Sequence, residues 1–158
     1  MIELQPADFA PLPEFGRAWR FLDPKYNVLS PAALADLHPI RPKCLATMSA
    51  VLESAFARIT TEAAQVTDIN ATCESEEARD QISTALVGLP IRTDQRVIVG
   101  WDRLDILETS WQTFCAYWDD FCYASSDDVT IYPLDGSWVL CYHHWERFSY
   151  TPITAPPT

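Results

Sequence analysis

The sequence has 158 residues and a formal net charge of −11, with 48% hydrophobic and 21% charged residues. This length and apolar content are typical of one globular domain and exclude a disordered chain. The acidic excess disfavours direct binding to nucleic-acid phosphates and to anionic membrane surfaces, whereas it attracts basic partners. No stretch approaches the roughly 20 apolar residues that a membrane span needs.

The first part of the chain predicts an arm, a strand and a helix. Residues 1–16 contain three prolines and are expected to form an extended arm on the body of the protein. Residues 17–22 alternate partly between polar and apolar types and are interpreted as a short strand. Ser30 followed by Pro31 predicts the start of a helix that ends near Leu37.

Two further helices are predicted from apolar residues that recur at helical spacing. The first occupies residues 42–60. The second begins after Thr72 or Ser75 and ends at Gly88. The residues between these two helices are polar and show no pattern.

The second half of the chain predicts strands around one more helix. Residues 96–101 form an apolar run that is typical of a buried strand. Thr109 or Ser110 is expected to begin a helix that runs through Cys122, with its aromatic residues on one face.

A hairpin is predicted near the C-terminus. The dipeptide Asp135-Gly136, a strong turn signal, separates a strand over 128–134 from a returning strand over 137–145. Residues 148–150 are expected to extend the returning strand.

The order of these elements predicts the fold class. Helices come first and do not alternate regularly with the strands, so we expect an α+β fold with helices packed on a small antiparallel sheet and a C-terminal β-hairpin. A single domain is expected over 1–150, and residues 151–158 are expected to form a loose tail.

Acidic charge is concentrated in the C-terminal third. Residues 100–150 contain nine acidic and two basic residues, with aromatic residues between them. The most distinctive segment is 118–129, in which two Asp pairs bracket a short polar loop. Acidic side chains beside Trp and Tyr are typical of a surface that binds a basic protein. The alternative interpretation is a packed aromatic core with a solvated acidic rim.

The residues predicted to bind this partner share the acidic and aromatic C-terminal region. They are Trp118, Asp119, Asp120, Tyr123, Asp127, Asp128, Trp138, Tyr142, His144, Trp145 and Glu146.

Signals for catalysis and for cofactors are weak. The five cysteines are odd in number and lack tight spacing, so free thiols in a reducing compartment are expected. Cys141 and His143 share one face of a strand, yet no basic residue nearby favours a thiolate. The acidic pairs match no calcium loop, no paired Cys or His spacing suggests zinc, and the four glycines form no phosphate loop. We therefore expect no metal and no cofactor.

The segment Trp111–Tyr150, rich in Asp, Trp and Tyr, resembles the small acidic α+β immunity proteins that accompany bacterial polymorphic toxins. The resemblance lies in architecture, covers about a quarter of the chain, and rests on no diagnostic motif. It implies a cognate toxin partner, a cytoplasmic location and no catalytic activity. The N-terminus also lacks the basic and apolar regions of a signal peptide, which favours the cytoplasm.

Two other functions remain as alternatives to an immunity protein. The first is a phage-type inhibitor that uses acidic side chains as mimics of nucleic-acid phosphates. The second is a small enzyme that uses Cys141 and His143, or a pair of carboxylates.

Overall fold

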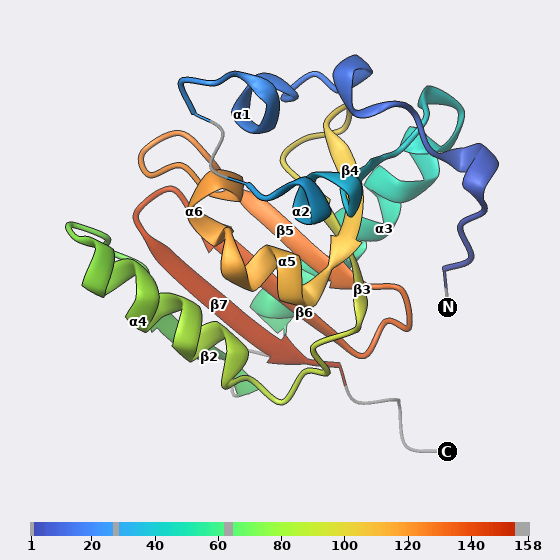
Figure 1. Cartoon of the computed structure of the whole chain (residues 1–158). Coiled ribbons are helices and arrows are strands. Elements are labelled where there is room, and N and C mark those ends of the chain that lie inside the picture. Colours follow the sequence, from blue (N-terminus) through green and yellow to red (C-terminus); the bar gives the residue numbers. More distant parts are fainter. Residues whose placement is uncertain (1, 27–28, 62–64, 154–158) are drawn as a thin grey trace.

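The computed structural model describes residues 2–26, 29–61 and 65–153 (Figure 1). Helices pack on a seven-stranded sheet in which all neighbouring strands are antiparallel, so the predicted α+β class is confirmed. In spatial order, the strands are β1 (His38–Pro39), β4 (Ile106–Ser110), β3 (Arg96–Gly100), β5 (Val129–Pro133), β6 (Trp138–His143), β7 (Arg147–Pro152) and β2 (Thr67–Asn70).

Helices cover both faces of this sheet (Figure 1). The long helix α3 (Pro42–Thr61) crosses one face. The other face carries α1 (Trp19–Leu22), α2 (Pro31–Ala35), α4 (Glu76–Val87), α5 (Trp111–Ala116) and α6 (Trp118–Phe121). The N-terminal arm, expected to be extended, contains two short 3-10 helices, Pro6–Asp8 and Leu12–Glu14.

Strand β6 shows why both faces need a cover. Its side chains alternate between the two faces, as the pleat of a strand requires. Trp138, Leu140 and Tyr142 enter the large core beneath the short helices, whereas Val139 and Cys141 pack beneath α3.

The predicted helix starts are confirmed where a serine provides the N-cap. The side-chain oxygens of Ser30, Ser75 and Ser110 each accept a hydrogen bond from the N–H three residues further along. Each bond satisfies a backbone donor that the first turn of a helix leaves free. The long helix predicted over residues 42–60 is also confirmed. The hairpin is confirmed as well, since β5 pairs with β6 across Asp135-Gly136.

Residues 19–22 form helix α1 directly after a turn at 16–18, so the strand predicted over 17–22 is wrong. Ala18 and Phe21, which lie one helical turn apart, are both buried and set the side of α1 that faces the core. The partial alternation of polar and apolar residues predicted a strand, but Arg20, one of its polar positions, is buried. Its buried partner lies far away in the sequence.

Other differences concern short elements. The helix expected from Ser110 to Cys122 is divided at Tyr117, whose backbone leaves the helical conformation between α5 and α6. Strands β2 and β4 were not predicted, because β2 is mostly polar and β4 contains the buried Glu108. Residues 147–152 form a separate strand, so the expected loose tail begins with residues that belong to the sheet. Of the remaining tail, residues 154–158 lie outside the described residues.

Three connections lie at the same end of the sheet, where β3 ends, β5 begins and β6 ends. These segments, 101–105, 122–128 and 143–146, are together called the loop end. The Ser125 N–H donates to the His144 carbonyl at 2.8 Å, which joins two of them directly. Among the described residues, no helix is both long and apolar enough to cross a membrane.

Candidate functional site

A buried ion pair fastens α1 to the loop end. Arg20 Nη1 donates to Asp127 Oδ2 at 2.6 Å and Nη2 donates to Oδ1 at 3.0 Å, and both side chains are only 3% exposed. Burial raises the pKa of Asp127, but the bonds from Arg20 and from the Tyr123 N–H outweigh this effect, and the pKa lies below its ordinary value. Asp127 therefore stabilises the fold through these buried bonds.

Aromatic rings surround the same arginine and extend to the surface. The Arg20 guanidinium lies 4.1 Å from the centroid of the Tyr123 ring and 5.3 Å from that of Trp19. Trp19 contacts Tyr26 at 5.3 Å between ring centroids. Trp19, Leu22 and Tyr26 remain 44%, 38% and 39% exposed and form an apolar surface that the sequence reasoning missed. The spacing of Trp19 and Leu22 places them on one side of the chain only once 19–22 is known to be helical.

The eleven residues predicted to bind a partner fall into two groups. Six are exposed or partly exposed, namely Asp119, Tyr123, Asp128, His144, Trp145 and Glu146. Five are buried, and for these the expected contact surface is corrected; they are Trp118, Asp120, Asp127, Trp138 and Tyr142.

The buried rings are part of the core for a physical reason. Large aromatic side chains contribute most when they are fully packed, provided that their polar atoms find partners. The Trp118 indole donates to the Arg79 carbonyl at 3.3 Å, and the Trp138 indole donates to Gln95 Oε1 at 3.2 Å. Tyr142 is only 1% exposed. The alternative interpretation of a packed core therefore holds for these three rings.

Asp120 is buried without a full set of hydrogen bonds. Its Oδ2 atom has no hydrogen-bond partner, and the residue is only 8% exposed. Burial, and secondly the neighbouring charge of Asp119, raise the pKa of Asp120 to about 7. Near neutral pH this carboxyl group is therefore divided between its neutral and ionised forms.

A hollow of about 270 Å³ opens on the side of the loop end that faces the short helices. We call it the helix-side hollow. Its lining residues come from three separate segments and are Ala71, Cys73, Trp118, Asp119, Cys122, Tyr123, Ala124, Tyr142 and Glu146. Two of these residues are acidic and none is Lys, Arg or His. Burial raises the pKa of Asp119, and the charge of Arg79, which lies outside the lining, offsets this effect only in part, so a further positive charge would stabilise the ionised form.

The turn between β6 and β7, which contributes Glu146 to this hollow, also exposes a large aromatic ring. Trp145 is 61% exposed, and its ring lies 5.5 Å from that of His143. Asp128 Oδ1 accepts a hydrogen bond from the His144 N–H at 3.0 Å, which connects the turn to the start of β5. Burial raises the pKa of Asp128, but the bonds from His144 outweigh it and the pKa is lowered. Glu146 completes the turn with a positive φ of 63°.

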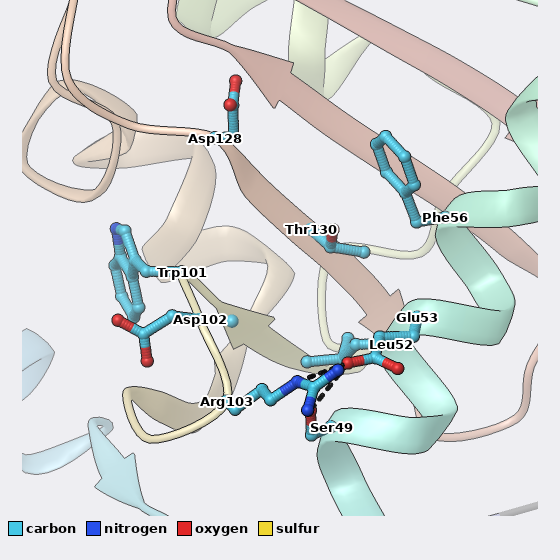
Figure 2. Close-up of a pocket in the computed structure, with 10 residues that line it drawn as sticks. Ser49, Leu52, Glu53, Phe56, Trp101, Asp102, Arg103, Asp128 and Thr130 are labelled. Carbon is cyan, nitrogen blue, oxygen red and sulfur yellow. Dashed lines mark hydrogen bonds and ion pairs between the residues drawn. The ribbon is translucent and has the colours of Figure 1, made fainter.

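A second cavity of about 290 Å³ lies on the opposite side of the loop end, between α3 and the β3–β4 connection (Figure 2). We call it the α3-side groove. Figure 2 shows Phe56 on α3 and Trp101 on the β3–β4 connection at opposite sides of the groove. The remaining lining residues are Ser49, Leu52, Glu53, Gly100, Asp102, Arg103, Asp128 and Thr130.

The thiols are poorly suited to nucleophilic chemistry. Burial raises the pKa of Cys141 to about 12, and its Sγ donates only to Thr130 Oγ1, at 3.9 Å. Burial also raises the pKa of Cys115 and Cys122. A reactive cysteine needs a lowered pKa, so the enzyme alternative based on Cys141 and His143 loses its chemical support. Within the ranges that the structure describes, no three His, Cys, Asp or Glu residues form a group that could hold a metal ion.

A polar cluster at the β1 edge of the sheet has a structural explanation. Arg96 forms ion pairs with Asp36 and with Glu108, and Glu108 Oε2 lies 2.7 Å from His38 Nδ1. Asp36 also accepts a hydrogen bond of 2.6 Å from Ser110 Oγ. These bonds join α2 to β3 and β4, and each carboxylate has a partner.

Comparisons with known proteins found no matching family model, no matching curated protein and no matching solved structure. The geometry of the loop end is therefore the basis on which a function is inferred.

Proposed function

We propose that this protein is a non-catalytic inhibitor of a basic protein, of the kind that an immunity protein provides against a bacterial toxin. The observation that carries the proposal is the helix-side hollow, whose two acidic side chains face no basic residue in its lining. A lysine or arginine of a partner would add positive charge to that of Arg79, which lies outside the lining. The partner's exclusion of water would strengthen that attraction.

Two aromatic side chains connect the hollow to apolar surface. Tyr123 lines the hollow and contacts the exposed Trp19, and the exposed Trp145 precedes Glu146, which also lines it. Electrostatic attraction mainly speeds association, whereas buried aromatic side chains slow dissociation. A surface that has both properties suits a stable complex with a basic partner. The five cysteines are all unpaired, which supports a reducing, cytoplasmic setting.

The proposal is tested with three forms of the protein as bait. One is the wild type, and one carries Asp119→Lys with Glu146→Lys, which reverses the charge of the hollow. The matched control carries Glu3→Lys with Asp94→Lys, two exposed positions at the opposite end of the sheet. Proteins retained from extracts of the source cells are identified by mass spectrometry, and each candidate is then purified and measured by surface plasmon resonance.

The wild type and the control are expected to bind the same basic protein, whereas the site variant is expected to bind it at least about tenfold more weakly. Trp145→Ala is expected to cost about 2 kcal/mol of binding free energy, mainly through faster dissociation. The proposal is refuted if the purified partner binds the site variant and the control equally well. It is also refuted if the only specific partner is acidic.

A further inference from the structure

The two edges of the seven-stranded sheet differ in how they are covered. The edge at β1 is closed by the N-terminal arm, because the Ala10 N–H donates to the Pro39 carbonyl and the Arg41 N–H donates to the Asp8 carbonyl, both at 2.8 Å. The edge at β2 has no strand beyond it among the described residues. An open edge presents unpaired backbone groups, to which another extended chain can bond.

The register between β2 and β7 shows which backbone groups of β2 are free. The Ala71 N–H donates to the Glu146 carbonyl at 2.8 Å, and the same register continues back through the strand. Hydrogen-bonded pairs alternate along an antiparallel ladder, so the N–H and C=O groups of Asp68 and Asn70 point away from β7. Within the part of the chain that the structure describes, no hydrogen bond reaches these four groups.

The side chains of β2 leave this edge accessible. Ile69 packs against the large core, whereas Thr67, Asp68 and Asn70 are exposed. Asp68 Oδ1 accepts a hydrogen bond of 2.7 Å from Ser149 Oγ, so this charged side chain is turned toward β7 and away from the free edge. The strand contains no Lys and no Pro, residues that commonly protect an edge from pairing.

Charge and position indicate what would occupy the edge. A second copy of this chain would bring a second net charge of −11 against the first, which disfavours self-pairing, whereas a basic chain would be attracted. Ala71 and Cys73, which come directly after β2, line the helix-side hollow, so the edge leads into the surface already assigned to the partner.

We propose that an extended segment of the basic partner pairs with β2 and adds a strand to the sheet. In this mode of recognition, backbone hydrogen bonds supply affinity without requiring a deep pocket. The identity of the partner rests on the proposed function, and the added strand specifies how that partner is held.

The test is a nuclear magnetic resonance titration of the ¹⁵N-labelled protein with a short basic peptide. The probe is acetylated and amidated Lys-Thr-Val-Thr-Val-Thr-Lys, whose Thr and Val residues favour an extended chain. It is expected to bind with a dissociation constant of about 1 mM and to shift the amides of Asp68 and Asn70 most strongly, because these N–H groups gain acceptors.

Two control peptides separate backbone pairing from charge. One is N-methylated at its five central residues, so it keeps the charge of the probe but has no central N–H to donate. The other has Glu in place of both Lys residues. Each is expected to bind at least about tenfold more weakly than the probe.

A variant of β2 locates the pairing. Asp68→Pro removes one outward N–H, and proline is tolerated at an edge position whose N–H faces solvent. The matched control Asp68→Ala also loses the charge and the bond to Ser149, but it keeps the N–H. The proline variant is expected to bind the probe at least about fivefold more weakly than the alanine variant. Unchanged amide signals from β6 and β7 verify that the variant is folded, and the peptide comparison on the wild type decides the question if it is not.

Equal binding of the probe and its N-methylated form would overturn the proposal, as would shifts confined to residues outside β2 and β7. Equal binding of the Glu peptide would overturn the choice of a basic segment. Shifts of the Asp68 and Asn70 amides that grow with protein concentration, without any peptide, would show that a second copy occupies the edge instead.

The proposed function is tested separately, by the helix-side variants. A purified basic partner that binds Asp68→Pro and Asp68→Ala equally well would refute the added strand and leave the proposed function standing. Probe binding at β2 together with the absence of any basic protein partner would refute the proposed function, while supporting strand pairing at this edge.

Discussion

Asp127→Asn tests whether the buried ion pair holds α1 to the loop end. The substitution keeps the size of the side chain but removes its charge. In the wild type, Asp127 accepts two bonds from Arg20 and one from the Tyr123 N–H, at 2.6 to 3.0 Å. The Arg20 guanidinium is 3% exposed in the wild type and donates a further bond of 3.3 Å to the Phe121 carbonyl, and after the substitution we expect it to stay buried and to keep this bond.

The expected cost follows from the charge that remains buried. Removing one partner of a buried ion pair destabilises a protein by about 3–5 kcal/mol, because the other charge is left uncompensated. Asn can still accept one hydrogen bond, so we expect about 3 kcal/mol. In a domain of this size, such a loss lowers the melting temperature by roughly 6–12 °C.

The assay is urea unfolding followed by circular dichroism, with thermal unfolding as a second measurement. The control is Asp128→Asn at the adjacent position, whose side chain is 63% exposed and whose bond to His144 lies at the surface. The control is expected to cost at most about 1 kcal/mol. The reasoning is wrong if Asp127→Asn destabilises the protein no more than Asp128→Asn does.

The pH dependence gives an independent check of the same pair. The folded-state pKa of Asp127 is lowered, so its contribution to stability is present above the unfolded pKa of 3.8 and is lost as the pH falls through the folded pKa. The difference in unfolding free energy between the wild type and Asp127→Asn should therefore shrink below pH 4. A difference that stays constant down to pH 2 would contradict the assignment.

Three further substitutions and one labelling experiment test other parts of the structure. Asp120→Asn should stabilise the protein by as much as about 4 kcal/mol at pH 8, because the folded pKa of about 7 means that the wild type loses stability as the pH rises from 4 to 7. A variant with the same unfolding free energy as the wild type at both pH 4 and pH 8 would contradict this. Gly100→Ala should cost about 1–2 kcal/mol in urea unfolding, since its Cβ would collide with the buried Leu52, and an unchanged midpoint would show that the leucine moves freely. Trp145→Ala should change the unfolding free energy by less than about 0.5 kcal/mol, so that any loss of partner binding reflects contact and not misfolding. At pH 8, iodoacetamide should alkylate Cys141 only after the protein has been unfolded, as detected by mass spectrometry. Rapid labelling of the folded protein would refute the burial and the high pKa of this thiol.

Local chemistry was sufficient to predict several elements of this fold. A serine before a helix satisfies a free backbone donor wherever the helix later packs, so Ser30, Ser75 and Ser110 marked helix starts correctly. Asp135-Gly136 specified the hairpin for a similar reason, because Gly136 adopts the positive φ that the turn requires. These interactions join residues a few positions apart, and the sequence alone therefore determines them.

Long-range packing decided which side chains reach the surface. The partner of Arg20 lies 107 positions away, so the sequence could not show that Asp127 is consumed by an internal ion pair. Acidic and aromatic composition marked a region of the chain, yet it could not distinguish the buried Trp118 from the exposed Trp145. Exposure depends on how the sheet, α1 and the short helices meet. The sequence by itself determined that acidic and aromatic residues gather in the last third of the chain. Only the tertiary structure decided which of them a partner can touch, because burial depends on contacts between segments that lie far apart in the chain.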